Sequence, residues 1–323
     1  MMRLNKSGSE FNSQRCSAWS ALVLVCAALG GGLEATACLI PVFQYAMENW
    51  SADAYRVVVR GDTTTDEAQA GLKMLEKVAR DGVNVELVQN ERTVESFAMT
   101  GSVTTSRMEV FYPARSGTHG PVWAGALNRE TVSRLLDSPA RREIAAHLLK
   151  GKAAVWVLLE SGNRRNDRRA MQTLKKESVR FKQMFKVDVP EPGTDVGEIQ
   201  MEIDFATVRV NRDDPAEQAL VEMLLGLEPD LRNFKDQPMV FPVYGQGLML
   251  YALVGEGINP LTLADVAGFL TGPCSCQVKA ANPGMDILLA PETAVQKRAR
   301  PNVTLPIGGP AGFLQKMREA GKK

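Results

Sequence analysis

Residues 238–254 read PMVFPVYGQGLMLYALV. Two apolar runs, 238–244 and 248–254, flank Gly245-Gln246-Gly247, and this pattern predicts a β-hairpin. Asn259-Pro260 then marks the start of a helix, because Asn is a good N-cap and Pro suits the first helical position. Leu263, Val266, Ala267 and Leu270 follow at helical spacing, and Gly272-Pro273 ends the helix. The segment therefore predicts the order strand, strand, helix.

The elements before this hairpin complete a pattern that occurs twice. The second copy predicts a helix from Pro139, a strand at 153–159, a long helix opened by Asn163 or Asp167 and running to about Phe185, a loop at 187–198, a strand at 201–210 and a helix capped by Asp214. The first copy predicts a helix at 41–50, a strand at 55–59, a helix capped by Thr65, strands at 83–88, 108–112 and 121–127, and a helix capped by Asn128. The two units are 38–137 and 138–290, and residues 291–323 form a flexible tail rich in Pro, Gly and basic residues.

The alternation of strands with helices favours an α/β fold. Strands joined through helices pair in parallel by right-handed crossovers, whereas the closing hairpin adds antiparallel strands. We therefore expect each unit to be a mixed, mostly parallel sheet with helices on both faces.

This order of elements resembles the thioredoxin-like fold. In that family a cis-proline precedes the first strand of the hairpin, and Pro238 matches this position, with Pro242 as a rival. Active members carry Cys-x-x-Cys where the first strand feeds its helix, but this sequence has Gly61-Asp62-Thr63-Thr64-Thr65 and Ser161-Gly162-Asn163-Arg164-Arg165 there. The resemblance therefore implies the fold without its usual redox site. Residues 38–50, 272–279 and 282–284 also resemble an uncharacterised family of exported bacterial proteins, and that resemblance implies no activity.

Residues 1–37 have the features of a secretory signal peptide. Arg3, Lys6 and Arg15 precede an apolar run at 18–29, and Ala35-Thr36-Ala37 offers small residues before a cleavage point. This leader predicts export to the periplasm or cell envelope. Membrane association would arise only through an uncleaved leader or a lipidated Cys38, although Ala35 stands where a lipid-attachment box usually has Leu.

Three of the five cysteines, Cys38, Cys274 and Cys276, lie outside the leader, which contains Cys16 and Cys26. We expect a structural disulfide from Cys38 to Cys274 or Cys276, because an oxidising compartment favours pairing. The alternative is a thiol–disulfide exchange site, because Cys38 precedes a helix that would stabilise its thiolate and a Cys-x-Cys disulfide is strained. A Cu(I) site built from the same sulfurs is a weaker alternative, since most methionines lie on apolar stripes. We expect no metal and no cofactor.

The charge balance excludes several classes of function. The chain has 38 basic and 37 acidic residues, and removing 1–37 takes away three and two of these, leaving 35 of each. A neutral protein is a poor candidate for binding nucleic acid. The main basic concentration is Arg164-Arg165-Asn166-Asp167-Arg168-Arg169 with Lys175-Lys176. It suggests an anionic partner, but the interleaved Asp167 and Glu177 favour an ordinary solvated helix face.

No motif for hydrolysis or phosphate binding is present. The two histidines, His119 and His147, have no sequence partner for a catalytic triad, and Asp213-Asp214 is explained by a helix cap. We therefore expect an exported binding or scaffold protein that is not catalytic at the usual site of the fold and whose partner is an envelope protein of unknown identity. The alternative is a thiol–disulfide oxidoreductase that uses Cys274 and Cys276 with Cys38.

Overall fold

The computed structural model describes residues 41–89, 105–190, 198–272, 279, 282 and 284–289. Residues 38–323 belong to one compact unit. The predicted signal peptide at 1–37 and the predicted tail at 291–323 lie outside the described residues, and both stay predictions.

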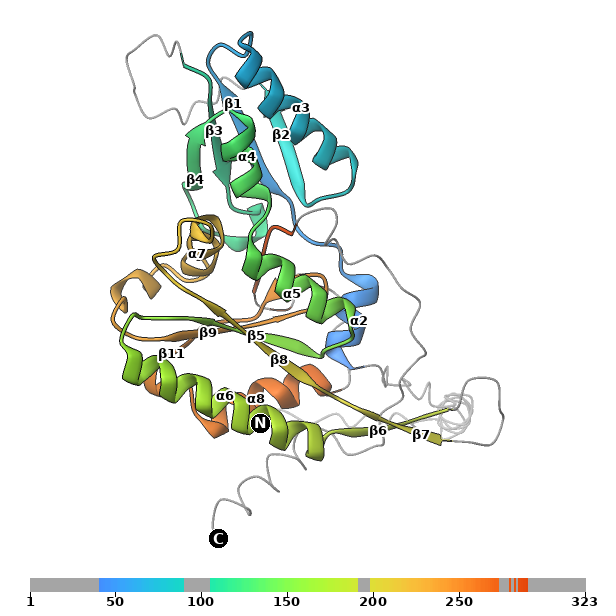
Figure 1. Cartoon of the computed structure of the whole chain (residues 1–323). Coiled ribbons are helices and arrows are strands. Elements are labelled where there is room, and N and C mark those ends of the chain that lie inside the picture. The colour runs from blue at the N-terminus through green and yellow to red at the C-terminus, as the bar shows by residue number, and fades with distance from the viewer. Residues whose placement is uncertain are drawn as a thin grey trace, which may run out of the picture. The chain divides into compact units, whose positions relative to one another are not determined.

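The first sheet has four strands in the order β2-β1-β3-β4 (Figure 1). Strand β1 (Tyr55–Arg60) pairs in parallel with β2 (Val85–Gln89) through helix α3 (Asp66–Arg80). Strand β3 (Arg107–Phe111) runs antiparallel to β1, and β4 (Pro121–Ala126) runs antiparallel to β3. Helix α4 (Arg129–Leu136) follows β4 and contacts α3.

The second sheet has six strands and repeats this order in its centre. Strand β5 (Ala154–Leu159) pairs in parallel with β8 (Phe205–Val210) and antiparallel with β9 (Met239–Tyr244). Strands β10 (Leu248–Met249) and β11 (Leu253–Val254) both pair with β9, and β12 (Met285–Asp286) pairs with β10. The chain is thus an α/β protein with two mixed sheets, as predicted. The expectation of mostly parallel sheets was wrong, since each contains one parallel pair and the remaining described connections reverse direction.

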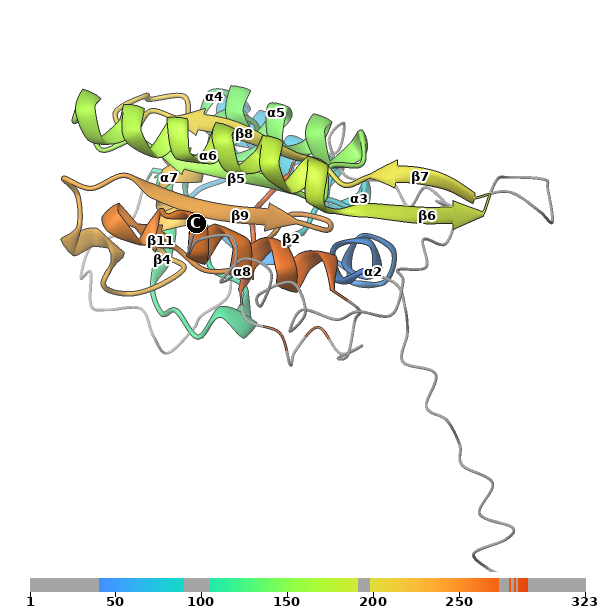
Figure 2. The ribbon, with the colours of Figure 1, turned by 90° about the horizontal axis from the view of Figure 1, so that it is seen from below.

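Helices cover the second sheet on two sides. Helices α2 (Val42–Asn49), α6 (Arg164–Met184) and α8 (Pro260–Thr271) share one apolar cluster with one face of the sheet, and Figure 2 shows them together. Helices α5 (Pro139–Leu149) and α7 (Gln218–Leu225) belong to the cluster on the other face. Helix α2 was expected to cover the first sheet, but Val42, Phe43 and Ala46 pack with the second sheet because their apolar stripe faces α8.

Four of the helices begin at the N-cap residues that the sequence predicts. Thr65, Asn128 and Asn163 each accept a backbone N–H in the first turn of the following helix, and Asn259 forms a full capping box with Thr262. These caps satisfy N–H groups that have no partner within the helix. Helix α7 was expected to start directly after a cap at Asp214, and this was wrong. The Asp214 carbonyl accepts the Glu217 N–H in a short turn, and the helix begins only at Gln218.

The segment expected to be a loop at 187–198 is partly extended. Strands β6 (Lys186–Pro190) and β7 (Glu198–Glu202) pair with each other as a separate two-stranded ribbon. The single strand expected at 201–210 is consequently divided into β7 and β8. The alternation that predicts one long strand also permits a strand to leave the sheet and pair locally.

Residues 284–289 form a C-terminal strap that joins the two sheets. Its strand β12 pairs with β10 of the second sheet. On the side of the first sheet, the Tyr55 hydroxyl donates to the Asp286 carbonyl at 2.7 Å, and Asn84 Nδ2 donates to the Ile287 carbonyl at 3.2 Å. One apolar cluster also includes buried residues from both sheets and the strap. The two sheets are therefore parts of one packed body.

Candidate functional site

The three cysteines outside the leader, Cys38, Cys274 and Cys276, lie outside the described residues, so their pairing stays a prediction. The chain on either side of them is described. The Val42 N–H donates to the Gly272 carbonyl at 3.0 Å, where α2 begins and α8 ends. Cys38 precedes this bond by four residues and Cys274 follows it by two, spans of at most about 14 and 7 Å of extended chain. The Val42–Gly272 bond is compatible with a disulfide between the two segments.

The junction after β1 is closed by local hydrogen bonds. Asp62 Oδ1 accepts the Thr64 N–H at 2.9 Å and the Thr64 hydroxyl at 2.7 Å, and these bonds lower the pKa of Asp62. The Ser106 hydroxyl donates to the Asp62 carbonyl, and Thr65 caps α3. The junction has no sulfur, and its polar groups serve the turn and the cap.

The junction after β5 is similar in construction but differs in charge. Asp167, which is buried, accepts the N–H and the hydroxyl of Ser161 at 2.9 and 2.8 Å. Asn163 Oδ1 accepts the N–H groups of Arg165 and Asn166. Behind the junction Arg212 donates to the Glu160 carbonyl, and burial lowers the pKa of Arg212. Ser161 therefore has a carboxylate partner but no histidine contact, and this is not a catalytic triad.

A pocket of about 290 Å³ lies beside this junction, between α6 and the segment leading into β9. Its lining includes Asn166, Arg169, Pro238 and Glu256. Arg169 donates two parallel hydrogen bonds of 2.8 Å to Glu256 across exposed surface. The pocket is lined largely by polar groups, and two of its charged side chains, Arg169 and Glu256, are paired with each other.

Pro238 at this pocket does not have the cis bond that was predicted. No described peptide bond is cis, so Pro238 and Pro242 are both trans. The Pro238 carbonyl accepts the Gly255 N–H at 2.9 Å, and the next residue, Met239, pairs with Val254 in the ladder. The ladder thus accommodates the trans form, which X–Pro bonds favour by about 0.5–1 kcal/mol.

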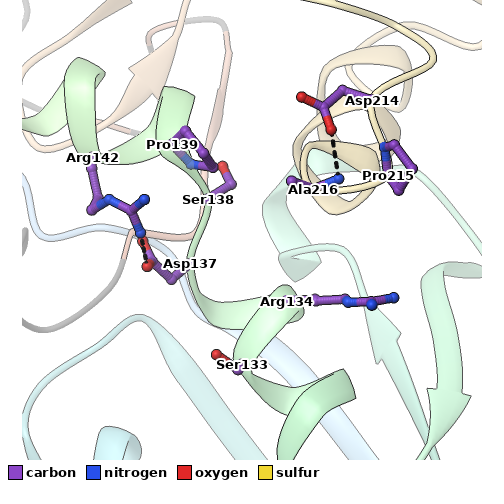
Figure 3. Close-up of a pocket in the computed structure, with 9 residues that line it drawn as sticks. All are labelled: Ser133, Arg134, Asp137, Ser138, Pro139, Arg142, Asp214, Pro215 and Ala216. Atoms are coloured by element: carbon purple, nitrogen blue, oxygen red, sulfur yellow. Dashed lines mark hydrogen bonds and ion pairs between the residues drawn. The ribbon is translucent and has the colours of Figure 1, made fainter.

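A larger hollow of about 450 Å³ lies between the end of α4, the start of α5 and the turn before α7. Figure 3 shows Arg142 meeting Asp137 on one side and Asp214 turned back to the Ala216 N–H on the other. Arg134 is paired with Glu130 at 2.6 Å. Each of the charged side chains that line this hollow thus has a partner, and the lining residues do not form a recognisable catalytic site.

His147 and His119 do not take part in either pocket. His147 Nε2 lies 3.7 Å from Glu143 in the same helix, and His119 is in the turn before β4. The described residues contain no group of three or more His, Cys, Asp or Glu side chains that could hold a metal ion. None of the described helices has both the length and the apolar character of a membrane span.

Among the carboxyl groups of the described residues, Asp286 has the pKa that is shifted most, and it lies in a buried cluster at the C-terminal strap. Asp286, whose side chain is 2% exposed, accepts the Asp53 N–H at 2.9 Å and contacts Lys279. Arg115 donates to Asp53 at 2.8 Å. Burial raises the pKa of Asp286 to about 6 despite Lys279. For Asp53, burial is outweighed by the hydrogen bond from Arg115 and the charge of Lys279, and the pKa lies below its ordinary value.

This cluster predicts a pH dependence of stability that reports on Asp286. Between about pH 4 and 6 the folded Asp286 retains a proton that the unfolded chain has lost, so the free energy of unfolding falls as pH rises through this range. Two pKa units correspond to about 3 kcal/mol. The lowered pKa of Asp53 adds stability that is lost as pH falls through the range in which Asp53 titrates, so Asp53 offsets part of the effect of Asp286. The neutral variant Asp286→Asn should lack this fall.

The measurement is the urea midpoint of wild type and Asp286→Asn from pH 4.5 to 7.5. We expect the stability of the variant relative to wild type to improve by about 1–3 kcal/mol as pH rises. Asp265→Asn, which changes an exposed aspartate on α8, is the control and should run parallel to wild type. Parallel curves for wild type and Asp286→Asn would show that Asp286 ionises normally in the folded protein.

Sequence reasoning did not single out this cluster or the Arg169–Glu256 pair. Both depend on residues far apart in the sequence, such as Asp53 with Asp286, and neither has a local motif. Comparison with protein-family models, curated proteins and solved structures found no match to this chain.

Proposed function

We propose that the protein is a binding or scaffold module of the cell envelope, built from two thioredoxin-like units that have lost the redox site of that fold. The observation that carries this proposal is the repeated strand order. In each unit a parallel β-α-β pair is followed by two antiparallel strands and a helix, as β2-β1-β3-β4 and as β8-β5-β9-β10. This agrees with the element order on which the resemblance rests.

The two strand-to-helix junctions support a non-redox role. The junctions at 61–65 and 161–165 contain no cysteine, and their side chains bond to the backbone that they cap. A fold that keeps its framework while this position serves only structure is suited to binding through its surface, since function depends on the site and not on the fold. The partner in this proposal is another component of the envelope.

The alternative is a thiol–disulfide oxidoreductase that uses Cys274 and Cys276 with Cys38. The observation that favours it is the Val42–Gly272 hydrogen bond, which brings the chain flanking these cysteines together. The same bond suits a purely structural disulfide between Cys38 and Cys274 or Cys276. The two proposals therefore differ in whether the sulfurs cycle, not in whether they meet.

Thiol chemistry separates the two proposals. Under the binding proposal, alkylation of the native exported protein labels at most one of Cys38, Cys274 and Cys276, and peptide mapping finds the disulfide between Cys38 and one of the other two. Neither wild type nor Cys276→Ala should accelerate insulin reduction. The Cys276→Ala variant should fold normally if Cys276 is the spare thiol, and Cys274→Ala is its matched control.

The oxidoreductase would give a different set of results. Wild type would reduce insulin, Cys276→Ala would lose that activity, and the reduction potential would fall between about −270 and −120 mV, the range of known disulfide catalysts. That combination would overturn the proposal of a binding module.

A further inference from the structure

The outer face of α6 is basic along most of its length. Its two acidic residues, Asp167 and Glu177, are both buried, at 7% and 2% exposure. They share the spacing of Ala170, Leu174 and Phe181, and so lie on the stripe that packs against the sheet. The sequence-based expectation that these acids neutralise the exposed face was therefore wrong.

The exposed charged residues of the helix are all basic: Arg164, Arg165, Arg168, Arg169, Lys175 and Lys176. We call these six the basic face. Arg169 is paired with Glu256, whereas the other five have no acidic partner among the described residues. From Arg164 to Lys176 the face extends about 18 Å along the helix. The described part of the chain thus has a concentrated positive surface on α6.

This arrangement opposes the stability of the helix itself. Cations at a helix N-terminus interact unfavourably with the helix dipole, and like charges four residues apart, such as Arg164 with Arg168, repel each other. Helix α3 in the same chain has Asp66 and Glu67 in its first turn, whereas the first turn of α6 combines the buried Asp167 with the exposed Arg164 and Arg165. These exposed arginines do not stabilise the helix, which is consistent with a role in binding.

Exposed apolar side chains also occur on the helical layer that contains α6. The large hydrophobic residues that the described structure leaves exposed are Val179 and Met184 on α6 and Leu261 on α8, and Val179 and Leu261 are each 61% exposed. Helices α6 and α8 lie side by side (Figure 2). Basic residues together with exposed apolar residues are typical of a surface that binds the interface of an anionic bilayer. Nucleic acid would use the charges but gain little from exposed Val and Leu.

The path of the chain agrees with a membrane partner. Helix α2, the first described helix, lies on the same face of the second sheet as α6 and α8. The predicted leader precedes α2 in the sequence, so a tether through the leader or through Cys38 would keep the chain close to a membrane. A tether raises the effective concentration of the surface at the membrane, so weak individual contacts suffice.

We propose that the basic face of α6, with Val179, docks on the surface of an anionic phospholipid bilayer. The charges attract the headgroup phosphates over the roughly 8 Å range that physiological salt allows, and the apolar side chains enter the interface. This inference rests on the proposed envelope location but not on the proposed lack of redox activity. Failure of docking and failure of the binding proposal are therefore seen in different assays.

The test is sedimentation of the full chain with vesicles of 30% phosphatidylglycerol in phosphatidylcholine, or of phosphatidylcholine alone. We expect the wild type to prefer the anionic vesicles and the triple variant Arg165→Gln, Arg168→Gln, Lys175→Gln to lose about 100-fold in partition coefficient, at about fivefold per charge. The matched control neutralises Lys73, Lys77 and Arg80 on the exposed surface of α3 and should stay within about twofold of wild type. The leader is the same in all three proteins, so its own affinity cancels.

Two further measurements separate a bilayer from other anions. Val179→Ser should weaken vesicle binding about fivefold, because apolar burial contributes to it, but should leave binding of a DNA duplex unchanged. Raising the salt to 500 mM should release the wild type from anionic vesicles to the level of the triple variant. Equal losses in the α6 and α3 variants, no preference for anionic vesicles, or insensitivity of vesicle binding to Val179→Ser would overturn the proposal.

Discussion

Replacing Arg141 by Met should cost about 3–5 kcal/mol of stability, a large share of the total of a typical domain. Arg141 is wholly buried and donates to the carbonyls of Leu135 and Leu288 at 2.7 and 3.2 Å. It also donates to the Arg134 carbonyl and the Ser138 hydroxyl. Methionine retains the apolar stem and the backbone N–H that Ser138 accepts, but it removes the guanidinium donors of the three carbonyls, and each buried unsatisfied group costs about 1–3 kcal/mol.

The positive charge of Arg141 is also compensated by the nearby carboxylate of Glu217. Burial lowers the pKa of Arg141 to about 10, and the nearby Glu217 carboxylate opposes this shift. The side chain therefore stays protonated at neutral pH. Removing it would leave Glu217, which is buried and accepts the Ala140 N–H at 2.8 Å, without its neighbouring cation. This adds to the loss expected from the hydrogen bonds alone.

Arg142→Met is the matched control. Arg142 follows Arg141 in the chain, but its side chain is 54% exposed and pairs with Asp137 at the surface, where ion pairs contribute about 0–1 kcal/mol. Guanidinium unfolding curves of the two variants measure the difference, and Arg141→Lys, which keeps the charge but not the planar fork, should fall between them. Similar losses in Arg141→Met and Arg142→Met would mean that the buried guanidinium does not join these segments.

Replacing Gly284 by Ala should cost about 3 kcal/mol. Gly284 has a φ of +116°, a conformation that L-residues rarely adopt, and an added Cβ would lie 1.9 Å from the carbonyl oxygen of Met249. That oxygen belongs to the backbone of β10, so it cannot move aside as a side chain would. The strap must then leave its place beside β10 or adopt a strained conformation.

The variant should release the strap before the rest of the protein unfolds. Hydrogen exchange at the Ile287 amide, which donates to the Gly247 carbonyl at 2.9 Å, reports on this release directly. Gly257→Ala is the control, because a Cβ at Gly257 would meet no atom within 4 Å and its φ is not positive. If Gly284→Ala protects Ile287 as well as wild type does, the close approach to Met249 is not maintained in solution.

Local signals in the sequence predict the elements of the fold well. The caps at Thr65, Asn128, Asn163 and Asn259 need only one side chain and the turn that follows it, so sequence reveals them. The strand directions were predicted less well, because the expectation of mostly parallel sheets was wrong and each main sheet has a single parallel pair among the described strands. Strand β12 could not be found this way, because two residues form it only when β10 lies beside them.

The burial of Asp167 and Glu177 is a different case, because its signal was present in the sequence. Both acids occur in register with Ala170, Leu174 and Phe181, which defines a single face of the helix. Counting charges along the chain mixed two faces that the helical period separates. The clusters around Arg141 and Asp286 have no such signal, since their partners are carbonyl groups and side chains brought together only by the completed fold.

The position of the strap has a consequence for when the protein can mature. Residues 284–289 are synthesised after all the other described strands. They accept a hydrogen bond from the Tyr55 hydroxyl of the first sheet and pair with β10 of the second. A nascent chain that ends before this point lacks the bonds of the strap, although the Tyr112 and Thr118 hydroxyls of the first half still donate to the Glu222 and Gly226 carbonyls of the second. The complete set of contacts can therefore form only after synthesis has passed residue 289, and, if the protein is exported as we propose, only after the strap has crossed the membrane.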